Sequence, residues 1–327
     1  MHETENGARR INYLRVSVTD RCNLRCRYCM PPGGIPQQSH DQILRYEEIE
    51  RLIQIAMSLD VNHVRITGGE PLVRLGVPEL VAAIASIPGI EEVSLTTNGI
   101  LLEEFARPLA EAGLKRINVS LDTLNGEKYS AHTRGGSLSA VLRGIEAAER
   151  EGLMPIKVNV VALRGFNDDE VFDFTHKTLA DGWHVRFIEI MPFGEAVSWF
   201  AGGYLPATEI REMIEAKFGE LLPQKVVGSG PARYWRLAGA EGTIGFISPI
   251  SAGYCASCNR LRLTADGRLI PCLAAEDEID VRTPLRHGAT DDELAMLFRT
   301  AIERKPMAQC LGDHDVSASR KMSRTGG

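Results

Sequence analysis

DRCNLRCRYCM, residues 20–30, carries three cysteines, Cys22, Cys26 and Cys29, at the spacing C-x3-C-x2-C. The motif directly follows Arg15–Thr19, which we expect to be the first strand. A loop that leaves the end of a strand can wrap three thiolates around one inorganic centre, and thiolate sulfur favours iron–sulfur clusters, zinc or copper(I). A [4Fe–4S] cluster normally takes four thiolates, so three cysteines would leave one iron open to a small-molecule ligand.

The alternative is a structural zinc site, which needs a fourth cysteine or histidine close by. The nearest downstream histidine is His40, beyond the loop PPGGIP at residues 31–36. A zinc site is therefore the less favoured interpretation of this first triplet.

Composition narrows the class of protein. The chain has 327 residues, of which 44% are apolar and 24% charged, enough for one large core or for a barrel with an appended region. The net charge of −6 argues against a nucleic-acid or membrane binder, no apolar run approaches a membrane span, and MHETEN at the N-terminus lacks the apolar stretch of a signal peptide. Six of the seven cysteines fall in two triplets, so we expect a reducing, cytoplasmic setting.

Short apolar strands alternate with amphipathic helical patterns between residues 15 and 191. Helical spacing of apolar residues runs from Ile49 to Leu59 and from Leu138 to Ala148, and Gly113 and Gly152 lie where helices would end. This alternation predicts βα units and a parallel sheet. Six units predict an incomplete (βα)6 barrel, with a flat, doubly wound sheet as the alternative. The expected strands are Arg15–Thr19, His63–Thr67, Glu92–Thr97, Arg116–Leu121, Pro155–Leu163 and His184–Met191.

The alternation of strands and helices ends after Met191. We expect a loop over residues 192–206, a helix over Thr208–Phe218, and a smaller α+β region with a second inorganic site. Its strands are expected at Arg233–Leu237 and Thr243–Ser248 and in a hairpin over Arg260–Cys272, before a last helix over Asp291–Lys305. The predicted division is a barrel at 10–192, a C-terminal region at 193–311 and a mobile tail at 312–327.

Turn residues follow several expected strands. The stretches are TGGEP at 67–71, TTNG at 96–99, SLD at 120–122 and EIMP at 189–192. Each one alone is an ordinary turn. Because active sites of α/β barrels lie at the carboxyl ends of the strands, these turns are expected to share one rim with the cysteines.

A second triplet, Cys255, Cys258 and Cys272, has the spacing C-x2-C-x13-C around the predicted hairpin. Such a spacing also suits a zinc ribbon, with Cys310 or His287 as the fourth ligand. The repeated count of three favours a second cluster, but the zinc alternative stays open. Cys310 is otherwise given no role.

Basic residues recur in the expected strands. Arg260 and Arg262 alternate with leucines, so both point to one face, where they could clamp phosphates or simply meet solvent. Four further basic residues lie in barrel strands, where a buried charge is costly without a counter-charge. If they point inward, they imply a polyanionic ligand such as a nucleoside triphosphate. These four are Arg15, Arg65, Lys157 and Arg186.

The first motif, with Tyr28 before its last cysteine, resembles the signature of the radical S-adenosylmethionine (radical SAM) enzymes. Over residues 10–327 the chain is similar to one family among them, the GTP 3′,8-cyclases of molybdenum cofactor biosynthesis. The second triplet, the run NRLRLTADGR at 259–268 and the terminal Gly-Gly carry this resemblance. The loop PPGGIP and Thr325 depart from the family's commonest forms.

The resemblance implies roles for individual residues. The first triplet would hold a [4Fe–4S] cluster that binds SAM, and the second triplet a [4Fe–4S] cluster that binds the guanine of GTP. Arg186 would line the substrate cavity, and Gly326 and Gly327 would belong to a catalytic tail. The implied SAM contacts are Tyr28, Gly69, Ser120 and Met191, and the implied GTP contacts are Arg15, Arg65, Thr96, Lys157, Arg260, Leu261 and Arg262.

The implied reaction begins when a 5′-deoxyadenosyl radical removes hydrogen from C3′ of GTP. The C3′ radical then adds to C8, giving (8S)-3′,8-cyclo-7,8-dihydroguanosine 5′-triphosphate. Implied partners are an electron donor of the flavodoxin or ferredoxin type and a downstream cyclic pyranopterin monophosphate synthase, and a homodimer is left open. The alternatives are a radical SAM peptide-modifying enzyme and a zinc-stabilised binding protein without catalysis.

Overall fold

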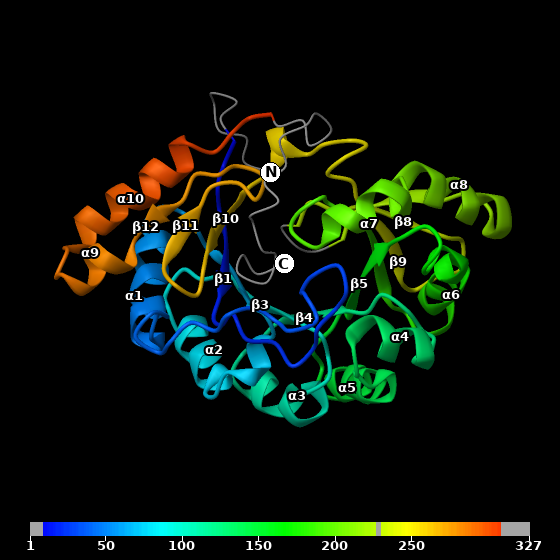
Figure 1. Ribbon diagram of the computed structural model, residues 1–327, viewed down its shortest axis with the longest axis horizontal. Coiled ribbons are helices and arrows are strands. Elements are labelled where there is room, and N and C mark those ends of the chain that lie inside the picture. Colours follow the sequence, from blue (N-terminus) through cyan, green and yellow to red (C-terminus); the bar gives the residue numbers. More distant parts are fainter. Residues whose placement is uncertain (1–8, 227–229, 309–327) are drawn as a thin grey trace.

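The computed structural model describes residues 9–226 and 230–308, whose strands form one sheet of 12 strands. Its order is β12-β11-β10-β1-β2-β3-β4-β5-β6-β9-β8-β7, and β1 to β6 run parallel in chain order (Figure 1). Six parallel strands in sequence confirm the predicted βα units. Their bounds are β1 Tyr13–Ser17, β2 His63–Thr67, β3 Glu92–Thr97, β4 Arg116–Ser120, β5 Lys157–Ala162 and β6 His184–Glu189.

The connecting helices lie along the outer side of the arched sheet (Figure 1). This one-sided arrangement makes the fold an open barrel, so the flat, doubly wound alternative was wrong. Gly113 and Gly152 follow α3 and α5 with φ of 90° and 73°, as predicted for helix ends. The helices are α1 Tyr46–Met57, α2 Val77–Ala85, α3 Leu102–Glu111, α4 Gly126–Thr133, α5 Leu138–Arg150 and α6 Val171–Ala180, with the 3-10 turns η1 Pro71–Val73 and η2 Asp168–Glu170.

The barrel strands alternate apolar and polar side chains. In β2, Val64 and Ile66 are fully buried and belong to the apolar core against the helices, whereas Arg65 between them points to the opposite face. The same pattern gives RINVS in β4 and KVNVV in β5. The strands are therefore less uniformly apolar than doubly covered strands usually are. Their inner face is polar, which makes the interior of the barrel a binding space.

The C-terminal strands extend both edges of this sheet. β10 (Arg260–Leu263) pairs parallel with β1, and β9 (Thr243–Ile247) pairs parallel with β6. The hairpin strand β11 (Arg268–Ile270) and β12 (Ile279–Asp280) continue one edge, while β8 (Arg233–Arg236) and β7 (Leu222–Gln224) continue the other. The pairing of β10 with β1 carries the second cysteine triplet to the barrel.

One element corrects the predicted loop over residues 192–206. Helix α7 (Ala196–Gly203) forms there because Ala196 packs with Leu163 and Ile190, and the aromatic rings of Trp199 and Phe200 join this cluster. Tertiary packing thus outweighs the glycines that favoured a loop. The remaining helices are α8 Ala207–Phe218, α9 Arg282–Arg286 and α10 Asp291–Glu303, with the 3-10 turn η3 Cys255–Ser257.

No helix within the described ranges is long and apolar enough to cross a membrane.

Candidate active site

A cavity of about 270 Å³ lies inside the barrel, bordered by the ends of its strands and by the first cysteine loop. It brings together most of the residues that the sequence singled out. These are Arg15, Cys22, Cys26, Tyr28, Cys29, Arg65, Gly69, Thr96, Ser120, Arg186, Met191, Arg260 and Arg262. The cavity also reaches residues that carried no predicted role, among them Glu70, Asp122 and Asn159.

Other predicted residues do not border this cavity. Leu261 is fully buried in the apolar core, on the face of β10 opposite to its two arginines. Lys157 is also buried, with its amine 5.7 Å from the ring centre of Tyr234. Gly326, Gly327 and Cys310 lie outside the described residues.

Backbone contacts shape the first cysteine loop. Cys29 N–H donates to the Cys26 carbonyl at 2.9 Å, which closes a turn between two of the thiols. Arg25 N–H and Arg27 N–H donate to the carbonyls of Thr133 and His132, at 3.0 and 3.1 Å, and so attach the loop to the end of α4. The loop therefore presents its thiols from a fixed backbone.

Gly69, in the turn after β2, packs closely against the backbone of the first cysteine loop. Its N–H donates to the Thr19 carbonyl at 2.7 Å, and a Cβ built on Gly69 would lie 2.3 Å from the Arg21 carbonyl oxygen. No side chain is tolerated at that separation. The glycine thus lets the turn after β2 close onto the cysteine loop.

The three thiols of the first loop suit a metal cluster by their chemistry. Burial raises the pKa of all three, and neighbouring thiols and Asp122 add to this at Cys26 and Cys29; together these effects bring the pKa of Cys29 to about 12. Thiolates here need positive charge, which iron would supply. No three of the described His, Cys, Asp or Glu side chains converge on a single metal ion, so the fit rests on the type and number of donors.

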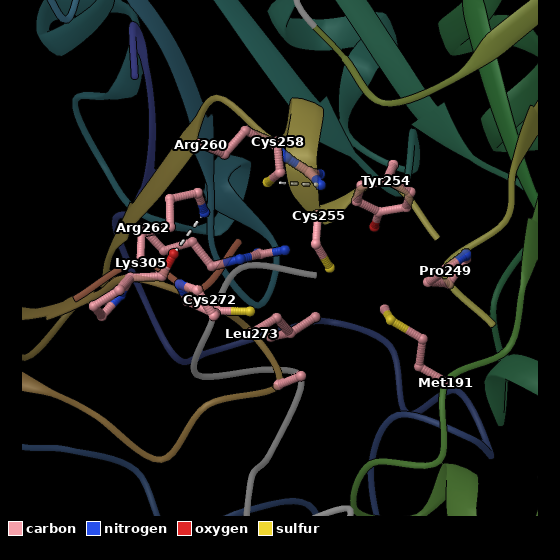
Figure 2. Close-up of a pocket in the computed structure, with 13 residues that line it drawn as sticks. Met191, Pro249, Tyr254, Cys255, Cys258, Arg260, Arg262, Cys272, Leu273 and Lys305 are labelled. Carbon is pink, nitrogen blue, oxygen red and sulfur yellow. Dashed lines mark hydrogen bonds between the residues drawn. The ribbon is translucent and has the colours of Figure 1, made fainter. Parts of the chain in front are cut away.

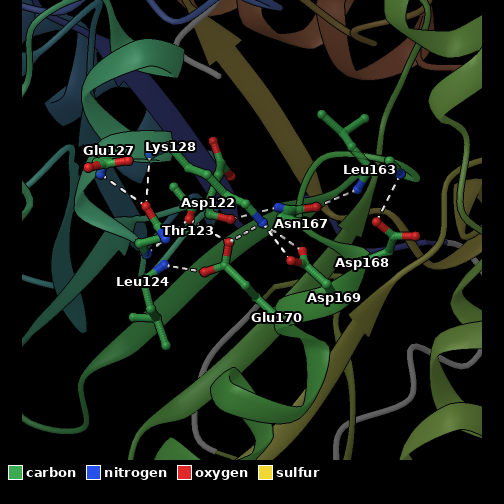
Figure 3. A network of polar contacts seen from close by, with 12 residues as sticks. Asp122, Thr123, Leu124, Glu127, Lys128, Leu163, Asn167, Asp168, Asp169 and Glu170 are labelled. Atoms are coloured by element: carbon green, nitrogen blue, oxygen red, sulfur yellow. Dashed lines mark hydrogen bonds and ion pairs between the residues drawn. The ribbon is translucent and has the colours of Figure 1, made fainter.

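Asp122 holds Tyr28 against the end of β5. The Tyr28 hydroxyl donates to Asp122 Oδ2 at 2.7 Å, and Val161 N–H donates to Asp122 Oδ1 at 2.8 Å. Asn167 Nδ2 donates to the Asp122 carbonyl at 2.6 Å, within the polar network of Figure 3. In the same network, Glu170 accepts from Thr123 Oγ1 at 2.6 Å. The SLD stretch marked this turn, but the contact with Tyr28 joins residues 94 positions apart.

Glu70 links two more strand ends. Its buried carboxylate accepts from Thr97 Oγ1 at 2.7 Å and from Asn98 N–H at 2.6 Å. Burial raises the pKa of Glu70 to about 7, although these hydrogen bonds act in the opposite direction. The TGGEP and TTNG turns predicted a shared rim, and this carboxylate is the contact that joins them.

Positive charge is concentrated on the inner face. Arg15 is the register partner of Arg65 on β2 and of Arg262 on β10. Burial and the neighbouring guanidiniums lower the pKa of Arg15, and burial with Arg260 lowers that of Arg262 to about 10. Burial, followed by Arg116 and Arg186, lowers the pKa of Lys157 to about 6. An anion in the cavity would relieve this repulsion.

Two buried oxygens on the cavity wall also point to a polar ligand. Thr96 Oγ1 and Asn159 Oδ1 have no hydrogen-bond partner within the described part of the chain. Buried polar atoms normally have partners, so a ligand with hydroxyl or amine groups would complete them.

The second triplet borders a smaller cavity of about 60 Å³ (Figure 2). Cys258 N–H donates to the Cys255 carbonyl at 3.1 Å in η3, and Arg260 Nη2 lies 3.6 Å from Cys258 Sγ. Burial raises the pKa of Cys258, but the charges of Arg260 and Lys305 outweigh it and bring the pKa to about 7. Three thiols beside basic groups suit a thiolate-held cluster.

The two cavities share part of their walls. Met191, Tyr254, Arg260 and Arg262 border both. The two cysteine triplets therefore face one continuous interior. Of the alternative zinc ligands, His287 lies beyond α9, with Nδ1 2.7 Å from the Thr283 carbonyl, and does not border the smaller cavity.

Comparison with known proteins finds two family models in the chain. The Radical SAM superfamily model matches residues 16–177, and the Molybdenum Cofactor Synthesis C model matches residues 183–310. A protein of Heliobacterium modesticaldum named GTP 3′,8-cyclase is 54% identical over 323 residues, which cover 98% of each chain. Another of that name, from Pelotomaculum thermopropionicum, is 53% identical over 299 residues, 91% of this chain and 92% of the relative.

A solved structure shares the fold. Streptococcus suis SuiB bound to S-adenosylmethionine superposes with a TM-score of 0.63 at 13% identity, covering 83% of this chain and 63% of SuiB. The chain thus spans less than two thirds of SuiB, and the likeness concerns the fold alone. The close relatives decide the identity: the chain belongs to the GTP 3′,8-cyclase family of radical SAM enzymes, which use S-adenosylmethionine and two [4Fe–4S] clusters.

Proposed function

We propose a division of labour inside this barrel for the conversion of GTP to (8S)-3′,8-cyclo-7,8-dihydroguanosine 5′-triphosphate, the first step of molybdenum cofactor biosynthesis. Cys22, Cys26 and Cys29 bind the cluster that carries SAM, and the second triplet binds the cluster that holds guanine. The observation that carries this proposal is the wall shared by the two cavities, since SAM and GTP must meet in one space.

The SAM side is formed by four residues at strand ends and in the cysteine loop: Tyr28, Gly69, Ser120 and Met191. All four border the larger cavity. Gly69 lets the turn after β2 close onto the cysteine loop at the edge of the SAM space, and Tyr28 is oriented for contact by its bond to Asp122. Met191 borders both cavities, so it lies where the two ligands would meet.

The GTP side is the basic inner face. Arg15, Arg65 and Arg262 take up the triphosphate from three neighbouring strands, and Arg260 adds a charge beside the second cluster. Arg186 adds positive charge from β6, Lys157 on β5 adds a buried amine that a nearby phosphate would favour in its charged form, and Thr96 supplies a hydroxyl. Leu261 acts through its backbone and through its packing, because its side chain faces the core.

When bound, SAM and its cluster supply the 5′-deoxyadenosyl radical that removes hydrogen from C3′ of GTP. The chain contributes orientation, because fixed ligands make this step effectively unimolecular. The barrel wall also excludes water and oxygen from the reacting atoms.

The wider assignments follow the same proposal. The units are a barrel at 10–192, a C-terminal region at 193–311 and a tail at 312–327, whose Gly326 and Gly327 assist catalysis. An electron donor of the flavodoxin or ferredoxin type reduces the first cluster, and a cyclic pyranopterin monophosphate synthase takes the product. The chain works in the cytoplasm, which agrees with six described cysteines that form no disulfide, and assembly as a homodimer is left open.

The deciding experiment uses GTP that carries deuterium at C3′. The reconstituted protein is incubated anaerobically with this GTP, SAM and a reductant, and the 5′-deoxyadenosine is analysed by mass spectrometry. Deuterium in that product supports the proposal. Deoxyadenosine without deuterium rejects abstraction from C3′ and favours another substrate, beginning with peptides. An intact cluster without any deoxyadenosine overturns the assignment of the first triplet.

A further inference from the structure

The three cysteines of the second triplet come from two separate segments. Cys255 begins the η3 turn and Cys258 directly follows it, before β10, whereas Cys272 follows β11. A cluster needs these two segments at a fixed separation. A third segment, residues 305–306 after α10, contacts the Cys272 segment directly and the Cys255 segment through Arg9.

Lys305 reaches the segment of Cys272. Its side chain is buried, with only 6% of the residue exposed, and Nζ donates to the Pro271 carbonyl at 2.7 Å. Pro271 is the residue directly before Cys272. Lys305 also borders the small cavity with all three cysteines, as Figure 2 shows. An ammonium group has two further N–H donors for this thiol-lined side.

Arg9 reaches the segment of Cys255. Its Nη1 donates to the Cys255 carbonyl at 2.7 Å and to the Pro306 carbonyl at 2.8 Å. Its Nη2 donates to the Lys305 carbonyl at 2.9 Å. One guanidinium near the start of the chain therefore joins η3 to the segment after α10.

We propose that Arg9 and Lys305 are positioning residues of the second cluster, which clamp its two cysteine segments together and place the Lys305 ammonium beside the thiolates. The inference rests on the proposed assignment of Cys255, Cys258 and Cys272 as ligands. Three thiolates bring negative charge into a small enclosed space, and a buried lysine is costly there unless it meets such charge. Groups that fix metal ligands from outside commonly change metal affinity by about 10- to 100-fold.

The test uses the full chain with both clusters reconstituted. Four variants are compared with the wild type: Lys305→Met, Lys305→Arg, Arg9→Gln, and the triple change of Cys255, Cys258 and Cys272 to Ser. The readouts are iron per chain, the rate of iron loss to a chelator, and the electron paramagnetic resonance (EPR) signals of the reduced clusters. Under the proposed assignment SAM should perturb the first signal and GTP the second, so each cluster has its own marker.

Lys305→Met and Arg9→Gln are expected to lose iron from the second cluster about tenfold faster and to weaken the GTP-sensitive signal. The SAM-sensitive signal should persist, which shows that the barrel is folded, and Lys305→Arg should recover much of the loss. If Lys305→Met fails to retain even the first cluster, Arg9→Gln decides alone.

Wild-type iron retention and a wild-type GTP-sensitive signal in both Lys305→Met and Arg9→Gln would overturn the clamp. The triple serine variant separates this failure from that of the proposed ligands. If that variant keeps both signals, the ligand assignment fails and the clamp fails with it.

Discussion

Arg15 on β1 is the register partner of Arg262 on β10, so two guanidiniums start from neighbouring positions of adjacent parallel strands. Burial lowers the pKa of both guanidiniums; the charge of Arg262 lowers that of Arg15 further, and the charge of Arg260 lowers that of Arg262. This arrangement costs stability in the absence of an anion, and a triphosphate between the two groups would reverse the cost.

Arg262→Ala is therefore expected to weaken GTP binding by about tenfold or more, because a charge-assisted hydrogen bond contributes roughly 1.5–3 kcal/mol. SAM cleavage should remain measurable, since Arg262 carries no predicted contact with SAM. Isothermal titration of GTP into the anaerobic protein measures the change. The control is Arg107→Ala, which removes an arginine from the exposed side of α3. Unchanged GTP affinity in Arg262→Ala would refute its role.

Gly69→Ala should disrupt the first cluster. The new methyl group would collide with the Arg21 carbonyl at 2.3 Å and push the cysteine loop away from β2. We expect about half the iron of the wild type and little 5′-deoxyadenosine, as for Cys22→Ala. The matched control is Gly126→Ala, where a Cβ meets nothing within 4 Å. Full iron content and wild-type SAM cleavage in Gly69→Ala would show that the close approach is not needed.

Asp122→Ala should impair the use of SAM without removing the cluster. The change releases the Tyr28 hydroxyl and leaves Val161 N–H without its acceptor. We expect a KM for SAM about tenfold higher and more deoxyadenosine formed per molecule of cyclised product, because Tyr28 would no longer be held in place. Steady-state kinetics with both products quantified would measure this.

Asp169→Ala is the control for that change. Asp169 belongs to the same polar network, but its side chain is 66% exposed and bonds Lys128. Loss of this exposed pair should cost at most about 1 kcal/mol of stability and leave the KM for SAM unchanged. Equal effects of the two substitutions would mean that the network stabilises the fold and does not position Tyr28.

The barrel was predicted well because the signals for its strands, such as alternating apolar and polar residues, lie within short stretches of sequence. β2 and β3 begin and end where the alternation of HVRIT and EVSLTT predicted them. The open sheet also follows from counting six βα units. The placement of β9 and β10 at opposite edges was not predictable in this way, because each pairs with a strand distant in the chain.

The active site, too, was predictable only where its signals are local in the sequence. The cysteine spacing and the basic residues in strands predicted most of the residues that border the cavity. The contacts of Glu70, Asp122 and Lys305 were not predictable, because folding brings their partners close from distant parts of the chain. Asp122 meets Tyr28 across 94 positions, and Lys305 meets Pro271 across 34. Only the turn stretches TGGEP and SLD hinted at the first two. Helix α7 was missed because glycines at 194, 202 and 203 hid an apolar face.

Lys157→Met should make the ligand-free protein more stable and GTP binding weaker. Burial, then Arg116 and Arg186, lower the pKa of Lys157 to about 6, whereas a lysine in an unfolded chain has a pKa of about 10.4. Between these values the unfolded chain binds more protons, so the contribution of Lys157 to the free energy of unfolding rises with pH. Because one pKa unit corresponds to about 1.4 kcal/mol, the variant should gain on the order of a few kcal/mol near pH 7 and show a Tm several degrees higher.

Measuring Tm over a range of pH tests whether the stability difference changes in the expected direction. The Tm difference between Lys157→Met and the wild type should be largest near pH 6 and shrink toward pH 10, as the wild-type amine loses its proton in both states. Thermal unfolding of the ligand-free chains by circular dichroism would follow it, with Lys115→Met as the control because Lys115 is exposed just before β4. Adding GTP should reverse the order, since phosphate stabilises the charged amine in the wild type alone. A Tm difference that grows with pH would contradict a buried, deprotonated Lys157.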